Sequence, residues 1–177
     1  MIGEAIRDES EFGVVLAKDD GIVNAGCTVS VEKVVERYPD GRMDILTRGR
    51  RRFEILSLDE EKTYLRGEVT FFDDDDFSAI PDEIKEQAVT NYKALSELGS
   101  SRDHTAPDMA DPQLSFQLAQ AVPDLDFLNS LLRHRSETGR LKQFNHFLNQ
   151  YIPRQRTIER MRQLAPTNGC GGRPAGV

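Results

Sequence analysis

The stretch YPDGRMDILTRGRRRFEI, residues 38–55, decides the fold because it joins a turn to two apolar alternations. Pro39 suits the first turn position and Gly41 tolerates a positive φ. Met43, Ile45 and Thr47 then alternate with the residues between them, and after Gly49 the same spacing places Arg51, Phe53 and Ile55 on one strand face. A period of two residues is typical of a β-strand with one face buried. The stretch therefore predicts a turn followed by two strands.

Outward from this stretch, three further segments favour strands. Residues 11–17, 22–38 and 63–72 are rich in valine and other β-prone residues, and the turn sequence Asp19-Asp20-Gly21 separates the first two. The second segment is long for one strand, so we expect a bulge or bend near Gly26. Five strands joined by short turns predict an antiparallel meander or small barrel.

After Phe77 the apolar period changes to that of helices. Pro81 and the two acidic residues after it predict a helix start, and further helices are expected to begin at Asp111-Pro112, Pro123-Asp124 and Ser136. We expect Pro153 to kink or break the last helix. Strands first and helices afterwards predict an α+β fold. The expected divisions are a β-rich domain at residues 1–78, a helical subdomain at 79–165 and a disordered tail at 166–177.

Charge and composition narrow the functional class. The 177 residues carry a formal net charge of −7, which gives no overall attraction for phosphate backbones. Residues 1–13 are charged within a few positions and no apolar run is long enough to cross a bilayer, so we expect a soluble cytoplasmic protein without a membrane partner. Cys27 and Cys170 lack the spacing of a disulfide framework or metal site.

The chain lacks the motifs of common catalytic sites, and we expect no enzyme activity, cofactor or metal. It has no GxxxxGK[ST] loop for nucleotide phosphates. Ser115 and Lys142 are an isolated serine and lysine, and Cys27 is more typical of a small buried residue than of a nucleophile. The histidines at positions 104, 134 and 146 have no paired-ligand spacing. The acidic run Asp73–Asp76 lacks the pattern of a calcium loop and is read as a solvated connection.

The order of these segments and their short sequence motifs resemble the Lon substrate-binding domain. This is the N-terminal domain of ATP-dependent Lon proteases, and it also occurs as a free-standing bacterial protein. The residues that carry the resemblance are FGV at 12–14, GC at 26–27, YPDGR at 38–42, RRFEI at 51–55, YLR at 64–66 and LSFQLA at 114–119. The resemblance covers nearly the whole chain up to the tail. It implies a PUA-like pseudo-barrel followed by a helical bundle, and recognition of polypeptides without catalysis.

One departure from the family pattern concerns the start of the chain. Family members usually begin with strands that contain a pattern like LPLFPL, whereas Met1 aligns after that segment. The resemblance therefore implies a pseudo-barrel that is incomplete at its N-terminus. An incomplete barrel exposes a sheet edge, so we expect pairing with another chain, including a second copy of this one.

The arginines of residues 48–52 leave two interpretations open. As in other PUA-like folds, the block Arg48–Arg52 is a candidate RNA-binding patch. Strand alternation instead sends neighbouring side chains to opposite faces, and Glu32, Glu36 and Glu54 are candidate partners for them. The acidic chain favours pairing within the protein. A third alternative, a stand-alone peptidase, would show as degradation of casein without ATP.

We therefore predict a non-catalytic module, active in protein quality control, that binds unfolded or partner polypeptides. A peptide strand added to an open sheet edge is the expected mode. The candidate binding residues are Phe71, Phe72 and Phe77, for which core packing is the competing interpretation. The phenylalanines that flank the acidic run are also expected to hold it against the barrel.

Overall fold

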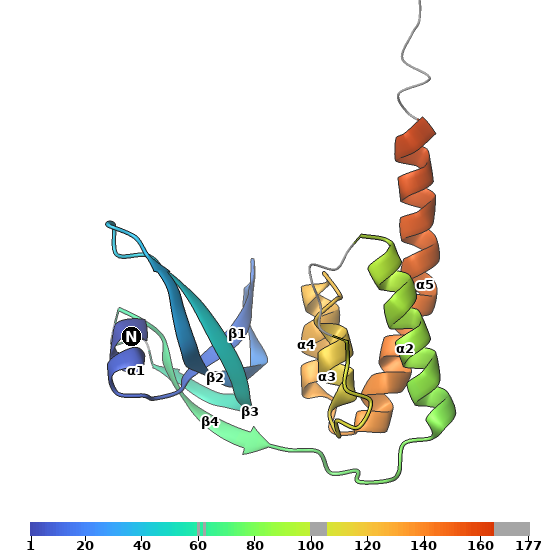
Figure 1. The fold of residues 1–177 in the computed structure, drawn as a ribbon. Coiled ribbons are helices and arrows are strands. Elements are labelled where there is room, and N and C mark those ends of the chain that lie inside the picture. Colours follow the sequence, from blue (N-terminus) through green and yellow to red (C-terminus); the bar gives the residue numbers. More distant parts are fainter. Residues whose placement is uncertain (60, 62, 100–105, 165–177) are drawn as a thin grey trace, which may run out of the picture. The chain divides into compact units, whose positions relative to one another are not determined.

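The computed structural model describes residues 1–59, 61, 63–99 and 106–164. Their contacts divide into two compact units (Figure 1). The first unit joins residues 1–77 to residues 124–136, and the second takes the described residues from 78 to 123 and from 137 onward. A sheet followed by helices confirms the predicted α+β class. The predicted disordered tail at 166–177, together with Cys170 and His104, lies outside the described residues.

The first unit is built on one antiparallel sheet. Its strands are β1 (Phe12–Lys18), β2 (Gly21–Arg37), β3 (Met43–Asp59) and β4 (Arg66–Phe72), hydrogen-bonded in that order. The described residues thus form four strands where the pattern predicts five. Gly49 does not end a strand, because it pairs with Val29 of β2 and keeps β3 continuous. The expected irregularity near Gly26 is a register shift between Cys27 and Val29.

The turn between β2 and β3 has the predicted chemistry. Gly41 has a φ of +90° and its amide donates to the carbonyl of Tyr38 at 3.0 Å. The Asp40 carboxylate accepts from the amide of Arg42 at 3.1 Å and from its guanidinium at 2.7 Å. These bonds, the amide first, lower the pKa of Asp40 below its ordinary value. The turn sets the register in which β2 and β3 pair.

Two helices belong with the sheet. The short α1 (Ile2–Arg7) places Ala5 in the core, and α4 (Leu125–Arg133) packs on β2. α4 begins at the predicted position, where the Asp124 carboxylate accepts from the amide of Phe127 at 2.8 Å. The helix pattern assigns residues 124–136 to the helical subdomain, whereas their contacts place them with the sheet. Periodicity identifies a helix but does not identify what its apolar face packs against.

The second unit contains α2 (Asp82–Glu97), α3 (Leu114–Ala119) and α5 (Glu137–Leu164). The side chains that form its core have no exposed surface: Leu95, Leu114, Leu118, Leu141, Phe144 and Leu148. Pro153 lies inside α5, so the predicted break does not occur, and α5 extends well beyond α2 (Figure 1). No helix in the described ranges combines the length and the apolar character needed to cross a membrane.

A buried charged cluster connects α3 to α5. The Glu137 carboxylate accepts from the amide and the hydroxyl of Ser115 at 2.7 and 2.6 Å. The Arg140 guanidinium, which is 0% exposed, donates to the same carboxylate at 2.7 Å and lies 4.5 Å from the ring centre of Phe116. A buried charge requires such a partner, because an unpaired one is costly in a low-dielectric interior. The sequence pattern did not reveal this cluster.

Candidate functional site

A row of residues crosses all four strands on one face of the sheet. Val15 pairs with Gly26, Gly26 with Phe53, and Phe53 with Phe71. A Cβ atom at Gly26 would lie 2.6 Å from the Phe53 ring and 2.4 Å from the carbonyl oxygen of Val14. Only glycine fits where the ring and a neighbouring backbone approach so closely. At this row the sheet backbone therefore packs closely against the Phe53 ring.

This face of the sheet forms one wall of a cavity of about 440 Å³. The cavity lies wholly within the first unit, between the sheet and α1, and its lining is mainly apolar. The principal apolar residues of the lining are Ala5, Val15, Ile22, Phe53, Ile55 and Val69. We call this cavity the groove. Its volume falls in the range of about 300–1,000 Å³ typical of ligand pockets.

Both outer strands of the sheet border the groove. Gly13 and Val15 of β1, and Gly67 and Val69 of β4, contribute to its lining. Within the described part of the chain, β1 pairs only with β2 and β4 only with β3. Each outer strand therefore has one edge whose backbone groups pair with no strand described here. Such an edge is a template for an added strand.

On the opposite face of the sheet, α4 packs against β2. Its anchor is Arg52, which is 8% exposed and donates to the Asp74 carboxylate at 2.6 Å. The same guanidinium donates to the carbonyls of Leu132 and His134 at 3.1 and 2.8 Å. A cation suits the carbonyl end of a helix. The groove and α4 thus lie on opposite faces of the sheet.

The remaining arginines of the block also have partners within the protein. Arg48 forms an ion pair with Glu32, one of the predicted partners, and Arg50 donates to the Ser30 hydroxyl at 2.8 Å. Arg51 places its guanidinium 3.6 Å from the ring centre of Phe71. The other predicted acidic partners bond elsewhere: Glu54 with Arg135, and Glu36 with the hydroxyl of Tyr38. These contacts favour pairing within the protein over a continuous phosphate-binding patch.

The three candidate phenylalanines lie in different surroundings. Phe72 is buried at 6% exposure, beneath the guanidinium of Arg135 at 4.7 Å. Phe71 is 40% exposed, on the groove side of β4, and Phe77 is 88% exposed. The expectation that the flanking phenylalanines hold the acidic run in place is therefore wrong for Phe77, which has little surface in contact with the protein.

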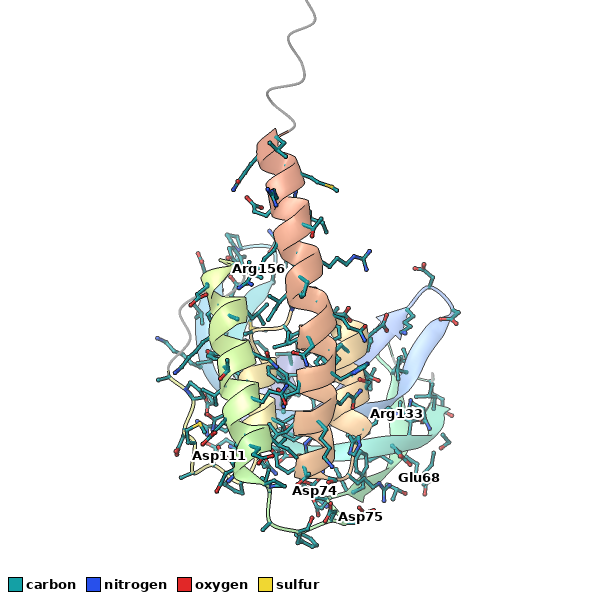
Figure 2. All side chains as sticks on the ribbon, turned by 90° about the vertical axis from the view of Figure 1, so that its right-hand side faces the viewer. Glu68, Asp74, Asp75, Asp111, Arg133 and Arg156 are labelled. Carbon is teal, nitrogen blue, oxygen red and sulfur yellow. The ribbon has the colours of Figure 1, made fainter. Side chains whose placement is uncertain are left out.

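The acidic run is held by polar contacts instead. Asp74 accepts from Arg52, Asp76 accepts from the Ser136 hydroxyl at 2.7 Å, and the amide of Asp75 donates to the carbonyl of Arg135 at 3.0 Å. Figure 2 marks Asp74 and Asp75 close together in this connection. Reading the whole run as a solvated connection was thus wrong for Asp74, because its partner comes from a strand 22 residues earlier.

The isolated nucleophile candidates are poorly placed for catalysis. Ser115 is 0% exposed and its hydroxyl donates to Glu137, whereas Lys142 is exposed. The Cys27 thiol donates to the carbonyl of Thr28 at 3.2 Å, and burial raises its pKa above the ordinary value. A raised pKa disfavours the reactive thiolate. In the described ranges no three of the side chains His, Cys, Asp and Glu gather as a metal site would require.

The groove was not predicted residue by residue. Of the candidate binding residues, only Phe71 lies on the same sheet face as its lining, in the row through Phe53. Gly26 carried the clearest signal, since a glycine inside a strand marks a close approach. The part played by α1 had no signal in the sequence beyond its helical pattern.

Comparison with known proteins identifies the family of this chain. The model of the ATP-dependent protease La (LON) substrate-binding domain matches residues 1–149. A Lon protease from Parabacteroides distasonis is 29% identical over 112 residues, which are 55% of this chain and 14% of that protein. The chain therefore matches only a small part of that relative's length.

Two solved structures share the fold. The Lon N-terminal domain protein from Xanthomonas campestris has a TM-score of 0.61 at 23% identity, over 80% of this chain and 78% of that one. The N-terminal domain of Mycobacterium avium complex Lon protease has a TM-score of 0.54 at 18% identity, over 82% of each chain. The predicted PUA-like sheet with helices after it is thereby confirmed. Since the family model matches most of its residues, this chain belongs to the ATP-dependent protease La (LON) substrate-binding domain family.

Proposed function

We propose that this chain is a free-standing, non-catalytic module that binds polypeptides. The family's description as a substrate-binding domain supports a role in recognition. The observation that carries the proposal is the groove of about 440 Å³, with apolar walls and an unoccupied strand edge on two sides among the described residues. An exposed apolar surface next to a strand edge suits an extended polypeptide better than a small polar metabolite.

In the proposed mode, the polypeptide joins the sheet as an additional strand. Its backbone N–H and C=O groups pair with the outer edge of β1 or β4, which supplies affinity that does not depend on sequence. Every second side chain then enters the groove, because side chains alternate between the two faces of a strand. The groove is about three times the size of a ~150 Å³ cavity that holds one benzene ring, so it has room for more than one apolar side chain.

Phe71 is the candidate phenylalanine that fits this mode best. Its ring lies on the groove side of β4 and is 40% exposed, so a bound side chain has surface to contact. Phe72 contributes to the core, and its replacement would act through stability. Phe77 remains a proposed contact through its exposure alone.

The module is proposed to act in protein quality control in the cytoplasm, on unfolded or partner polypeptides. Catalysis is not part of the proposal, because the sequence has no nucleotide-binding loop and Ser115 is buried and bonded. A second copy pairing through the same sheet edge is a further proposed partner. Such pairing would compete with peptide binding, since both need the edge of β1 or β4.

Fluorescence anisotropy with a labelled extended peptide of alternating valine and serine tests the proposal. Val69→Asp places a charge in the groove lining and should weaken binding at least tenfold, because burying a carboxylate among apolar side chains is unfavourable. Val35→Asp is the matched control: Val35 is 62% exposed and lies outside the groove lining, so binding should be unchanged. Circular dichroism melts establish that both variants fold.

Two outcomes would contradict the proposal: no binding at millimolar peptide, or equal binding by the wild type and Val69→Asp. A labelled single-stranded RNA, titrated over a salt series, tests the RNA alternative on the same instrument. RNA affinity that falls steeply with salt, and that Arg50→Ser abolishes, would favour that alternative. Release of peptides from casein by the purified chain, with or without ATP, would show catalysis.

A further inference from the structure

The charges beside the groove are unevenly compensated. Arg66, the basic residue of its lining, forms ion pairs with Asp59 and with Glu61. Arg7 of α1 forms an ion pair with Asp8 at 3.2 Å. These two positive side chains are thus paired with acidic neighbours within the protein, whereas Arg51 lies against the Phe71 ring.

Two acidic side chains beside the groove, in contrast, form no ion pair with a described residue. Glu11 lines the groove immediately before β1, and Glu68 is exposed on β4 between two residues of the lining. Figure 2 marks Glu68 at the margin of the sheet. Within the described residues, neither Glu11 nor Glu68 forms an ion pair, whereas Arg7 and Arg66 do, and Arg51 lies against the Phe71 ring. Each of the two outer strands therefore carries, next to the groove, one exposed carboxylate that forms no ion pair with a described residue.

The alternation of β4 determines where a bound strand meets this charge. Gly67 and Val69 face the groove, so Glu68 between them projects from the other face of the same edge. In a polypeptide paired with β4, the residues that enter the groove alternate with residues that lie on the side of Glu68. Directly opposed side chains of opposite charge stabilise a strand pair, and like charges destabilise it.

From this placement we infer that the groove selects extended segments in which apolar residues alternate with lysine or arginine. The inference rests on the proposed function, since it names the class of polypeptide that the same groove takes. Glu11 and Glu68 act as specificity-determining residues, and the apolar lining accepts the intervening side chains. Acidic segments with the same apolar residues are excluded by repulsion at both edges.

Three labelled nine-residue peptides test this selectivity. All carry the same valine and phenylalanine positions, with lysine, serine or glutamate between them. By anisotropy at low salt, the lysine peptide should bind about five- to tenfold more tightly than the serine peptide, and the glutamate peptide should bind most weakly. The difference should shrink as sodium chloride is raised to about 1 M, because exposed charges are then screened.

Reversing the charges of Glu11 and Glu68 tests whether these two residues cause the peptide selectivity. The double variant Glu11→Lys/Glu68→Lys changes two exposed residues and should invert the order, so that the glutamate peptide binds more tightly than the lysine peptide. Glu86→Lys/Glu97→Lys, which makes the same change at two exposed positions of α2, is the control and should keep the order of the wild type. This pair separates local complementarity from attraction by the overall charge of −7.

The outcomes distinguish the inference from the proposed function. If all three peptides bind equally, or the glutamate peptide binds best, the inference is overturned while peptide binding stands. The inference also fails if the double reversal leaves the order unchanged, or if the α2 control inverts it as well. If none of the peptides binds at millimolar concentration, the proposed function itself fails.

Discussion

Replacing Arg52 by methionine should remove a buried polar anchor of the sheet unit. The guanidinium donates to the Asp74 carboxylate at 2.6 Å and to the carbonyls of Leu132 and His134. Methionine keeps much of the apolar volume beside Phe72 but leaves the Asp74 carboxylate, whose side chain is 17% exposed, without this cation. Breaking a buried ion pair from one side costs about 3–5 kcal/mol, and we expect a loss of about 3 kcal/mol at this partly solvated carboxylate.

Arg48→Met is the matched control, since it makes the same chemical change on the same strand. Arg48 is 63% exposed and pairs with Glu32, so its loss should cost about 1 kcal/mol or less. The chain has no tryptophan, so urea unfolding is followed by far-ultraviolet circular dichroism. With an m-value of about 2 kcal/mol/M, Arg52→Met should lower the urea midpoint by about 1.5 M and Arg48→Met by about 0.5 M or less.

The double variant Arg52→Met/Asp74→Asn tests whether the ion pair is the cause. Once the cation is gone, the uncharged amide is easier to bury than the carboxylate, so Asp74→Asn should cost less in the Arg52→Met background than in the wild type. Equal midpoints for Arg52→Met and Arg48→Met would refute the reasoning, because they would show that burial adds nothing to this arginine. Hydrogen exchange of the β3 amides assigns the loss to the sheet unit, should the two units unfold separately.

Three further changes test other parts of the structure. Gly26→Ala should lower the melting temperature by about 6 °C, since the added methyl group would lie 2.4 Å from a carbonyl oxygen of β1; a melt within 1 °C of the wild type would count against this close approach. Arg140→Met should cost about 3–5 kcal/mol in urea unfolding, and adding Glu137→Gln should recover part of it, because a neutral amide still accepts hydrogen bonds without leaving a buried charge; no recovery would contradict the ion-pair explanation. In a Cys170→Ser background, the pH midpoint of Cys27 alkylation by iodoacetamide should lie above the ~8.5 of a free thiol, because burial disfavours the thiolate; a midpoint at or below that of the urea-unfolded chain would exclude a raised pKa.

Local patterns predicted those features that depend on neighbours in the sequence. Pro39 and Gly41 mark the turn between β2 and β3, and Asp124 marks the start of α4, because turn and cap preferences act over a few residues. The same reasoning misplaced a strand end at Gly49, and of the kink or break expected at Pro153 the break does not occur. In both places packing over the whole element outweighs the local preference of one residue.

The sequence by itself determined the order of sheet and helices, the turn chemistry and the family. These follow from the hydrophobic period, from the backbone preferences of single residues and from short sequence motifs. Tertiary structure decided which arginine is buried. Arg50 and Arg52 alternate identically along β3, yet only Arg52 meets the end of α4, whose Leu132 is 80 residues away in the sequence. It also decided that α1 and the two outer strands enclose a groove. The cost of burying a charge and the volume of a cavity both depend on neighbours in space, and one-dimensional patterns do not contain those neighbours.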